Sequence, residues 1–147
     1  MPNWIEGSLK VRGKTQNLIN FIENVIDNFS KLKYNNDIEY SFEKWTYIKN
    51  SRRAFINDCV IYINSNKENQ TIVLPIKQAW SFIASDGEEK RWVALANDYK
   101  VDIRLQGFEC GLEFYQDFAI VNGEIIIDEV KQYENWDWEC PMPRLGG

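Results

Sequence analysis

The chain has 147 residues, of which 44% are hydrophobic and 14% aromatic, and its net charge is −5. This length and apolar content predict one folded domain with its own core and exclude a disordered chain. The sequence contains no histidine and no apolar run of about 18 residues, which excludes histidine-based catalysis, the commonest metal ligand and a membrane-spanning helix.

The first 30 residues predict a strand and then a helix. Ile5, Leu9 and Val11 alternate with polar residues as far as Gly13, a period of two that indicates a half-buried strand. Thr15 stands where a helix N-cap is expected. The following segment, residues 16–29, has one apolar stripe at helical spacing, formed by Leu18, Ile22, Val25 and Phe29. It predicts an amphipathic helix lying on the sheet.

Residues 38–42 alternate again and predict a second strand, which a bulge would continue through Trp45 to Tyr47. The loop 49–53 follows and holds the densest basic cluster of the chain, with Arg52 and Arg53. We expect these two arginines to lie in solvent and, if they act, to contact an acidic group on a partner.

Two short β-rich runs, residues 59–63 and 71–76, are separated by the polar segment 64–69. This pattern predicts a hairpin. Pro75 has no backbone N–H to donate, so we expect the second run at a sheet edge or at a strand end.

Ser85 and Glu88 have the spacing of a capping box and predict a helix over residues 87–99, followed by a strand over 101–105. Asn122-Gly123 separates two apolar runs and predicts a tight hairpin, because both turn positions need positive φ. Residues 129–139 could form a last strand or an extended tail.

This order of elements predicts an α+β fold. The simplest arrangement is a ferredoxin-like split β-α-β plan with additional antiparallel strands and both helices on one face of the sheet. We expect a single domain over residues 1–140 and an irregular tail over 141–147, which contains two prolines.

No catalytic or ligand-binding motif is present. Cys59, Cys110 and Cys140 are odd in number and far apart, which gives neither a disulfide framework nor zinc-ligand spacing. There is no glycine-rich phosphate loop, no EF-hand spacing and no signal peptide. We therefore expect a cytoplasmic, non-enzymatic protein without metal or cofactor.

The N-terminus resembles that of a known family. Asn3-Trp4 followed by Leu9, Val11 and Gly13 is similar to the start of the YubB ferredoxin-like proteins, although Ile5 and Gly7 stand where that family has Cys and Asn. The resemblance extends to further positions, namely Trp92, Leu95, Tyr99, Glu109, Gly111 and Phe114. It implies a ferredoxin-like fold and an origin on phages or plasmids, and it implies no activity.

Charged residues are distributed unevenly along the chain. Residues 1–100 hold 14 Lys and Arg against 12 Asp and Glu, whereas residues 101–147 hold 3 against 10. Acidic surfaces repel nucleic acid and suit basic partners, including the basic grooves of nucleic-acid enzymes. Together with the resemblance, this favours a mobile-element protein that inhibits a host nucleic-acid-directed defence, in the manner of an anti-CRISPR.

The predicted docking surface is the segment 133–139. Its candidate residues are Tyr133, Glu134, Trp136, Asp137, Trp138 and Glu139. Tryptophan is enriched at binding hot spots, and carboxylates beside it would steer a basic partner. The same pattern also fits an edge strand whose tryptophans cover the core.

Two other functions remain open. One is a single-stranded nucleic-acid-binding module, since ferredoxin-like sheets can present aromatic rings to bases; the acidic balance argues against direct nucleic-acid binding. The other is a carrier protein that uses Gly146-Gly147. Dimerisation through an exposed strand edge is also left open by the sequence.

Overall fold

The computed structural model describes residues 3–51, 53–83 and 87–147, which form one antiparallel sheet and three helices. The strands are β1 (Trp4–Lys14), β2 (Ile26–Lys33), β3 (Asp37–Ile48), β4 (Ala54–Ile56), β5 (Cys59–Asn64), β6 (Asn69–Ala79), β7 (Asp102–Glu109), β8 (Phe114–Val121) and β9 (Glu124–Gln132). The helices are α1 (Thr15–Val25), α2 (Glu88–Tyr99) and α3 (Trp136–Glu139). The predicted α+β class is confirmed.

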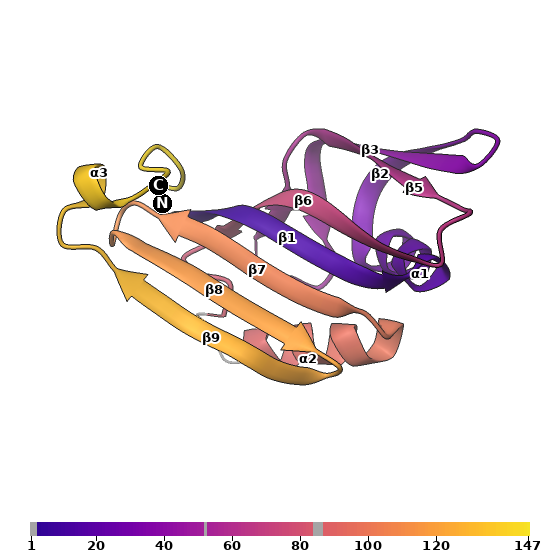
Figure 1. Cartoon of the computed structure of the whole chain (residues 1–147). Helices are drawn as coiled ribbons and strands as arrows, with labels where there is room; N and C mark the ends of the chain where they lie inside the picture. Colours follow the sequence, from indigo (N-terminus) through magenta and orange to yellow (C-terminus); the bar gives the residue numbers. More distant parts are fainter. Residues whose placement is uncertain (1–2, 52, 84–86) are drawn as a thin grey trace.

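The strands follow the order β2-β3-β4-β6-β1-β7-β8-β9, and β5 pairs with β3 (Figure 1). Every neighbouring pair is antiparallel, so strands two places apart run parallel. Thus β6 and β7 are parallel, with β1 between them, and the chain passes from one to the other through α2.

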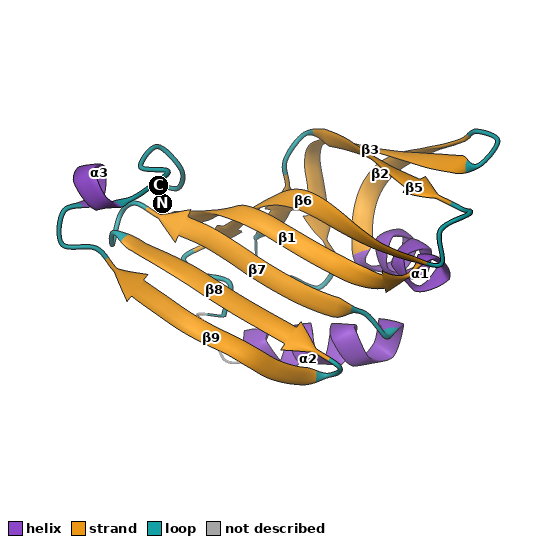
Figure 2. Cartoon of the chain, in the orientation of Figure 1, coloured by secondary structure: helices purple, strands orange, loops and turns teal. Residues whose placement is uncertain are grey.

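Helices α1 and α2 pack on the same face of this sheet (Figure 1). Leu9 of β1 lies opposite Leu74 of β6 and Leu105 of β7, so these side chains share a face. They join a single buried core with apolar residues of both helices, namely Leu18, Phe21, Ile22, Val25, Trp92 and Ala96. The opposite face, here called the open face, carries neither helix (Figure 2).

Two glycines let the core close over the centre of the sheet. Gly7 and Gly107 are paired across β1 and β7. A Cβ on Gly7 would lie 1.9 Å from the carbonyl oxygen of Gln106, and one on Gly107 would lie 2.8 Å from the ring of Phe82. The missing side chain of Gly7 therefore lets the backbones of β1 and β7 lie close together, and that of Gly107 leaves room for the buried Phe82 ring on the sheet.

The predicted helix over residues 16–29 is wrong in its last turn, because α1 ends at Val25 and Ile26 begins β2. Thr15 is the first helical residue and Lys14 is the N-cap. Phe29, assigned to the helix stripe, instead packs its ring on Tyr40 across β3, with 5.6 Å between centroids. Ile26 and Phe29 have helical spacing, but a bulge between Asp27 and Phe29 lets both contact the core from a strand paired with β3.

The predicted hairpin of residues 59–63 and 71–76 has the right strands but the wrong partners. β5 pairs with β3, whereas β6 pairs with β1 along its whole length and with β4 at its end. A long ladder with β1 gives β6 more hydrogen bonds and cross-strand contacts than the short β5 could supply.

Pro75 does not lie on an edge strand, since β6 is in the interior of the sheet. The Pro75 carbonyl accepts a hydrogen bond from the N–H of Asn57 at 3.0 Å, just beyond the end of β4. In a strand the N and C=O of one residue point to the same side. The missing N–H of Pro75 therefore faces the short β4 side, where the ladder has already ended, and β1 loses no bond.

The two predicted turn signals have different outcomes. Asn122 and Gly123 connect β8 to β9 with φ of 52° and 78°, which confirms the hairpin. Ser85 lies outside the described residues, so its capping box is not tested. Helix α2 begins at Glu88, whose carboxylate is engaged by Arg91 and Gln78.

Candidate functional site

The segment predicted to dock a partner is neither a strand nor an extended tail. β9 ends at Gln132, and residues 136–139 form the one-turn helix α3 beyond the end of the sheet (Figure 1). The Glu139 carboxylate accepts the backbone N–H groups of Glu134 and Asn135 at 2.8 and 2.7 Å. Glu139 therefore holds the turn in shape.

Trp136 is a packing residue. It is 7% exposed and forms a small cluster with the buried Tyr133 and Cys140, set on Phe108 and Tyr115 of the open face. The centroid of the Trp136 ring lies 5.5 Å from that of Tyr133 and 6.4 Å from that of Phe108. Its indole N–H donates to the Pro143 carbonyl at 2.8 Å, which also ties down the tail. Burial raises the pKa of Tyr133.

Trp138, by contrast, is 87% exposed, more than any other large apolar side chain of the described residues. The acidic side chains of Glu134 and Asp137 beside it are also exposed. Of the two tryptophans in the segment, one thus fixes the helix to the domain and the other stands in solvent among carboxylates.

The basic pair of the 49–53 loop is only half described. Arg52 lies outside the described residues. Arg53 is exposed, and its carbonyl accepts the N–H of Ala79 at 3.1 Å. Within the described part of the chain, no hydrogen bond or ion pair connects Arg53 with residues 133–139.

The open face carries a row of side chains that sequence reasoning missed. Residues directly opposite one another in neighbouring strands share a face, and these pairings continue across the sheet. The row is Tyr47, Phe55, Lys77, Glu6, Phe108, Tyr115 and Lys131. The four aromatic residues of this row, Tyr47, Phe55, Phe108 and Tyr115, were visible in the sequence, but the strand pairing that aligns them was not.

Most charges farther along the open face are paired. Arg12 lies 2.7 Å from Asp102, and Arg104 lies 2.7 Å from Asp117. The hydrogen bonds that Arg104 donates to the Asp117 carboxylate raise the pKa of Arg104. Arg12, Asp102 and Arg104, with Lys10, line a hollow of about 220 Å³. The face is therefore close to neutral in this region.

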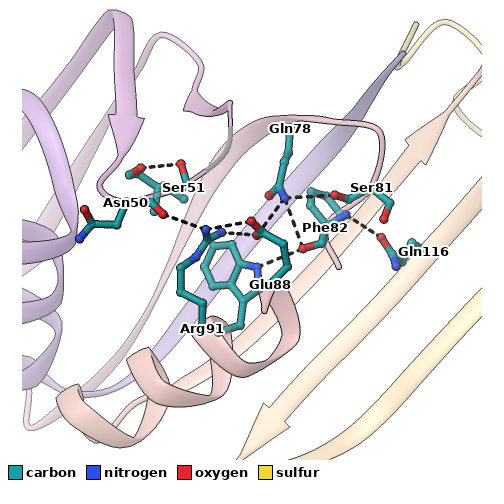
Figure 3. Close-up of polar contacts among 10 residues, drawn as sticks. Asn50, Ser51, Gln78, Ser81, Phe82, Glu88, Arg91 and Gln116 are labelled. Carbon is teal, nitrogen blue, oxygen red and sulfur yellow. Dashed lines mark hydrogen bonds and ion pairs between the residues drawn. The ribbon is translucent and has the colours of Figure 1, made fainter. Parts of the chain in front are cut away.

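A buried polar network on the other side of the sheet has a structural role (Figure 3). Arg91 pairs with the buried Glu88 and donates to the Asn50 carbonyl at 3.0 Å, which links α2 to the 49–53 loop. Gln78 donates to the Phe82 carbonyl at 3.3 Å, and the Gln116 amide oxygen accepts the Phe82 N–H at 2.9 Å. The network satisfies backbone groups of Ser81 and of the buried Phe82.

The described residues contain no group of three or more Cys, Asp or Glu arranged to hold a metal ion. Cys59, Cys110 and Cys140 are free thiols. Burial raises the pKa of Cys59 and of Cys110, which favours the unreactive thiol form. The Cys110 thiol donates to the carbonyl of Gly146 at 3.2 Å, and the Gly147 N–H donates to Trp4 at 2.9 Å, so both terminal glycines are packed against the domain.

In the described part of the chain, no helix combines the length and apolarity that crossing a bilayer requires. Comparison of the chain with protein-family models, with curated proteins and with solved structures finds no match.

Proposed function

We propose that the chain is a non-enzymatic binding protein that docks a basic protein partner through Trp138. The observation that carries the proposal is the opposite placement of Trp136 and Trp138 in α3, one buried and one almost fully exposed. Tryptophan is the residue type most enriched in binding hot spots, and this one lies beside the exposed carboxylates of Glu134 and Asp137.

The backbone around Trp138 is fixed before any partner arrives. Trp136 anchors the helix below it, and Glu139 accepts two backbone N–H groups at its start. A preformed loop loses less conformational entropy on binding than a mobile one does. The side chains of Glu134 and Asp137 supply negative charge that steers a basic partner toward the indole.

The partner class is a basic nucleic-acid-binding effector, and the biological form of the proposal is inhibition of a host defence by a protein of a phage or plasmid. Two observations support it, the strongly acidic chain after residue 100 and the YubB-like N-terminus. A ferredoxin-like plan belongs to the same proposal. Its support is the arrangement of β6, α2 and β7 around β1.

The test is capture of partners from lysates of cells with intact defence systems, followed by inhibition of nucleic-acid cleavage by the captured effector. Trp138→Ala and the double variant Glu134→Lys, Asp137→Lys should fold like the parent and lose both capture and inhibition. Glu139 is left unchanged, because it holds the turn.

A matched control is Glu124→Lys, Glu129→Lys, which makes the same charge change at two exposed residues of β9. It should capture like the parent. If the Trp138 and charge-reversal variants retain capture, or if the control loses it equally, Trp138 is not the docking residue. Binding by the parent should also weaken as salt rises, since the charges involved are exposed.

A further inference from the structure

A cleft of about 620 Å³ opens on the open face, where residues of β1, β3, β4 and β6 line it. Three aromatic rings line it, those of Trp4, Trp45 and Phe55. Phe55 touches both indoles, with centroids 6.1 Å from Trp4 and 6.0 Å from Trp45. The volume falls in the range of small-ligand sites, about 300–1,000 Å³.

Trp45 reaches this cleft because of an unusual bulge. Between the ladder pairs Asp27–Tyr47 and Phe29–Phe42, residues 43–46 of β3 oppose the single residue Asn28 of β2. Trp45 itself has φ of +74°, a rare conformation for a bulky side chain. Bulges re-aim side chains, and backbone strain of this kind concentrates at functional sites.

The bulge is held rather than loose. Thr46 is completely buried, and its hydroxyl donates to the Asn28 carbonyl at 2.9 Å. The structure thus fixes Trp45 in a strained conformation and leaves its side chain 65% exposed beside the cleft. Its ring contacts Phe55 and lies outside the buried core cluster.

The charges in the cleft discriminate between ligands. The ammonium groups of Lys44 and Lys77 lie 5.4 Å from the ring centroids of Trp45 and Trp4. They already occupy the cation positions over both indoles, so a cationic ligand would be repelled. Lys77 is paired with Glu6 at 2.9 Å, whereas Lys44 forms no salt bridge with any residue that the structure describes. Lys44 is therefore available to an anion.

We propose that the cleft binds an unpaired nucleobase of a single-stranded nucleic acid. The base stacks on the exposed indole of Trp45 in place of the Lys44 ammonium, and Lys44 moves to contact the adjoining phosphate. Every base has a π face, and base–aromatic stacking with a nearby cation is the usual means of binding single strands. Asn57 and Asp58 also line the cleft and supply hydrogen-bonding groups for a base edge.

This site is distinct from the docking residue Trp138 and goes beyond the proposed function. The acidic balance of the whole chain opposes nucleic-acid binding in general, but the charged residues that line the cleft itself are two lysines and one aspartate, Lys44, Lys77 and Asp58. With few phosphate contacts, binding should depend on stacking more than on salt.

The test titrates the whole protein into fluorescein-labelled ten-nucleotide oligo(dT) and oligo(rU) and follows anisotropy, with dTMP and UMP as competitors. The parent should bind the oligonucleotides. Trp45→Ala should weaken binding about 5- to 150-fold, the loss of about 1–3 kcal/mol of stacking for one base. Lys44→Gln should reduce the slope of log K against log salt by about 0.7.

Matched controls are Tyr34→Ala, an exposed aromatic residue near the opposite end of β3, and Lys90→Gln, an exposed lysine on α2. Both should bind like the parent. Circular dichroism and unfolding midpoints identify any variant that fails to fold. If Trp45→Ala is unstable, Lys44→Gln still tests the proposal.

Four outcomes would overturn the proposal. The first is that the parent binds neither oligonucleotide, and the second is that Trp45→Ala and Lys44→Gln both bind like the parent. The mononucleotides compete as tightly as the oligonucleotides, which would make the cleft a nucleotide site. A proline-rich peptide, and not an oligonucleotide, quenches the tryptophan fluorescence of the parent but not of Trp45→Ala, which would make the cleft a peptide groove.

Discussion

Replacing Trp136 by alanine should destabilise the domain by about 3–5 kcal/mol, whereas the same change at Trp138 should cost less than about 0.5 kcal/mol. A tryptophan buries roughly 150–250 Å², which at about 25 cal/mol per Å² corresponds to about 4–6 kcal/mol. Because Trp136 is only 7% exposed, its burial contributes nearly all of this free energy to stability. Its hydrogen bond to the Pro143 carbonyl adds about 1 kcal/mol. The cluster lies outside the main core, where relaxation lowers the loss.

The measurement is urea unfolding of the two single variants and the parent, with comparison of midpoints and slopes. For a slope of about 1.5 kcal/mol/M, Trp136→Ala should shift the midpoint down by about 2–3 M, and Trp138→Ala by about 0.3 M or less. The two variants delete the same side chain two residues apart, so they control for each other.

A double-mutant cycle adds a second criterion. Phe108 contacts Trp136, so the two single variants Phe108→Ala and Trp136→Ala should interact. The sum of their losses of unfolding free energy should exceed the loss measured for the double variant. Equal midpoints for the two tryptophan variants would refute the reasoning. So would strict additivity with Phe108, because it would show that the cluster contributes nothing as a unit.

Three further predictions concern the core and its charges. Gly7→Ala should prevent stable folding, because its Cβ would lie 1.9 Å from a backbone oxygen; a cooperative unfolding transition with a parent-like midpoint would contradict this. Arg91→Ala should cost about 3–5 kcal/mol by leaving the buried Glu88 carboxylate without its partner, as thermal unfolding can measure; a Tm within a degree of the parent would exclude it. Hydrogen bonding from Lys31 holds the pKa of Glu23 below its ordinary value, so this stabilisation is present above the unfolded pKa and disappears as pH falls through the folded one. Glu23→Gln should therefore show a smaller loss of Tm than the parent between about pH 6 and pH 3, and an unchanged loss would argue against the contact.

The sequence alone determined the local elements in which a single signal dominated. Alternation at positions 5, 9 and 11 specified the first strand, because one face of it is buried along its length. Asn122-Gly123 specified a hairpin, because both residues adopt positive φ at little cost. Both signals act within a few residues, so no distant partner could change them.

Only the tertiary structure decided which strands pair. The segment after Val25 carries Ile26 and Phe29 at helical spacing, and pairing with β3 through a bulge makes it a strand instead. Pro75 was expected at an edge, yet a short neighbouring strand accommodates it in the sheet interior. The row of side chains from Tyr47 to Lys131 on the open face is aligned only by the registers of six strand pairs, and none of these registers follows from composition.

The candidate site shows the same division. The sequence identified Trp136 and Trp138 as residues with one shared role, because in a strand two residues apart point to the same side. The structure places them in a helical turn, where each residue advances by about 100°, so two residues apart point in nearly opposite directions. One indole is therefore buried against the sheet and the other faces solvent. That outcome depends on which neighbours α3 packs against, and those neighbours come from β7 and β8.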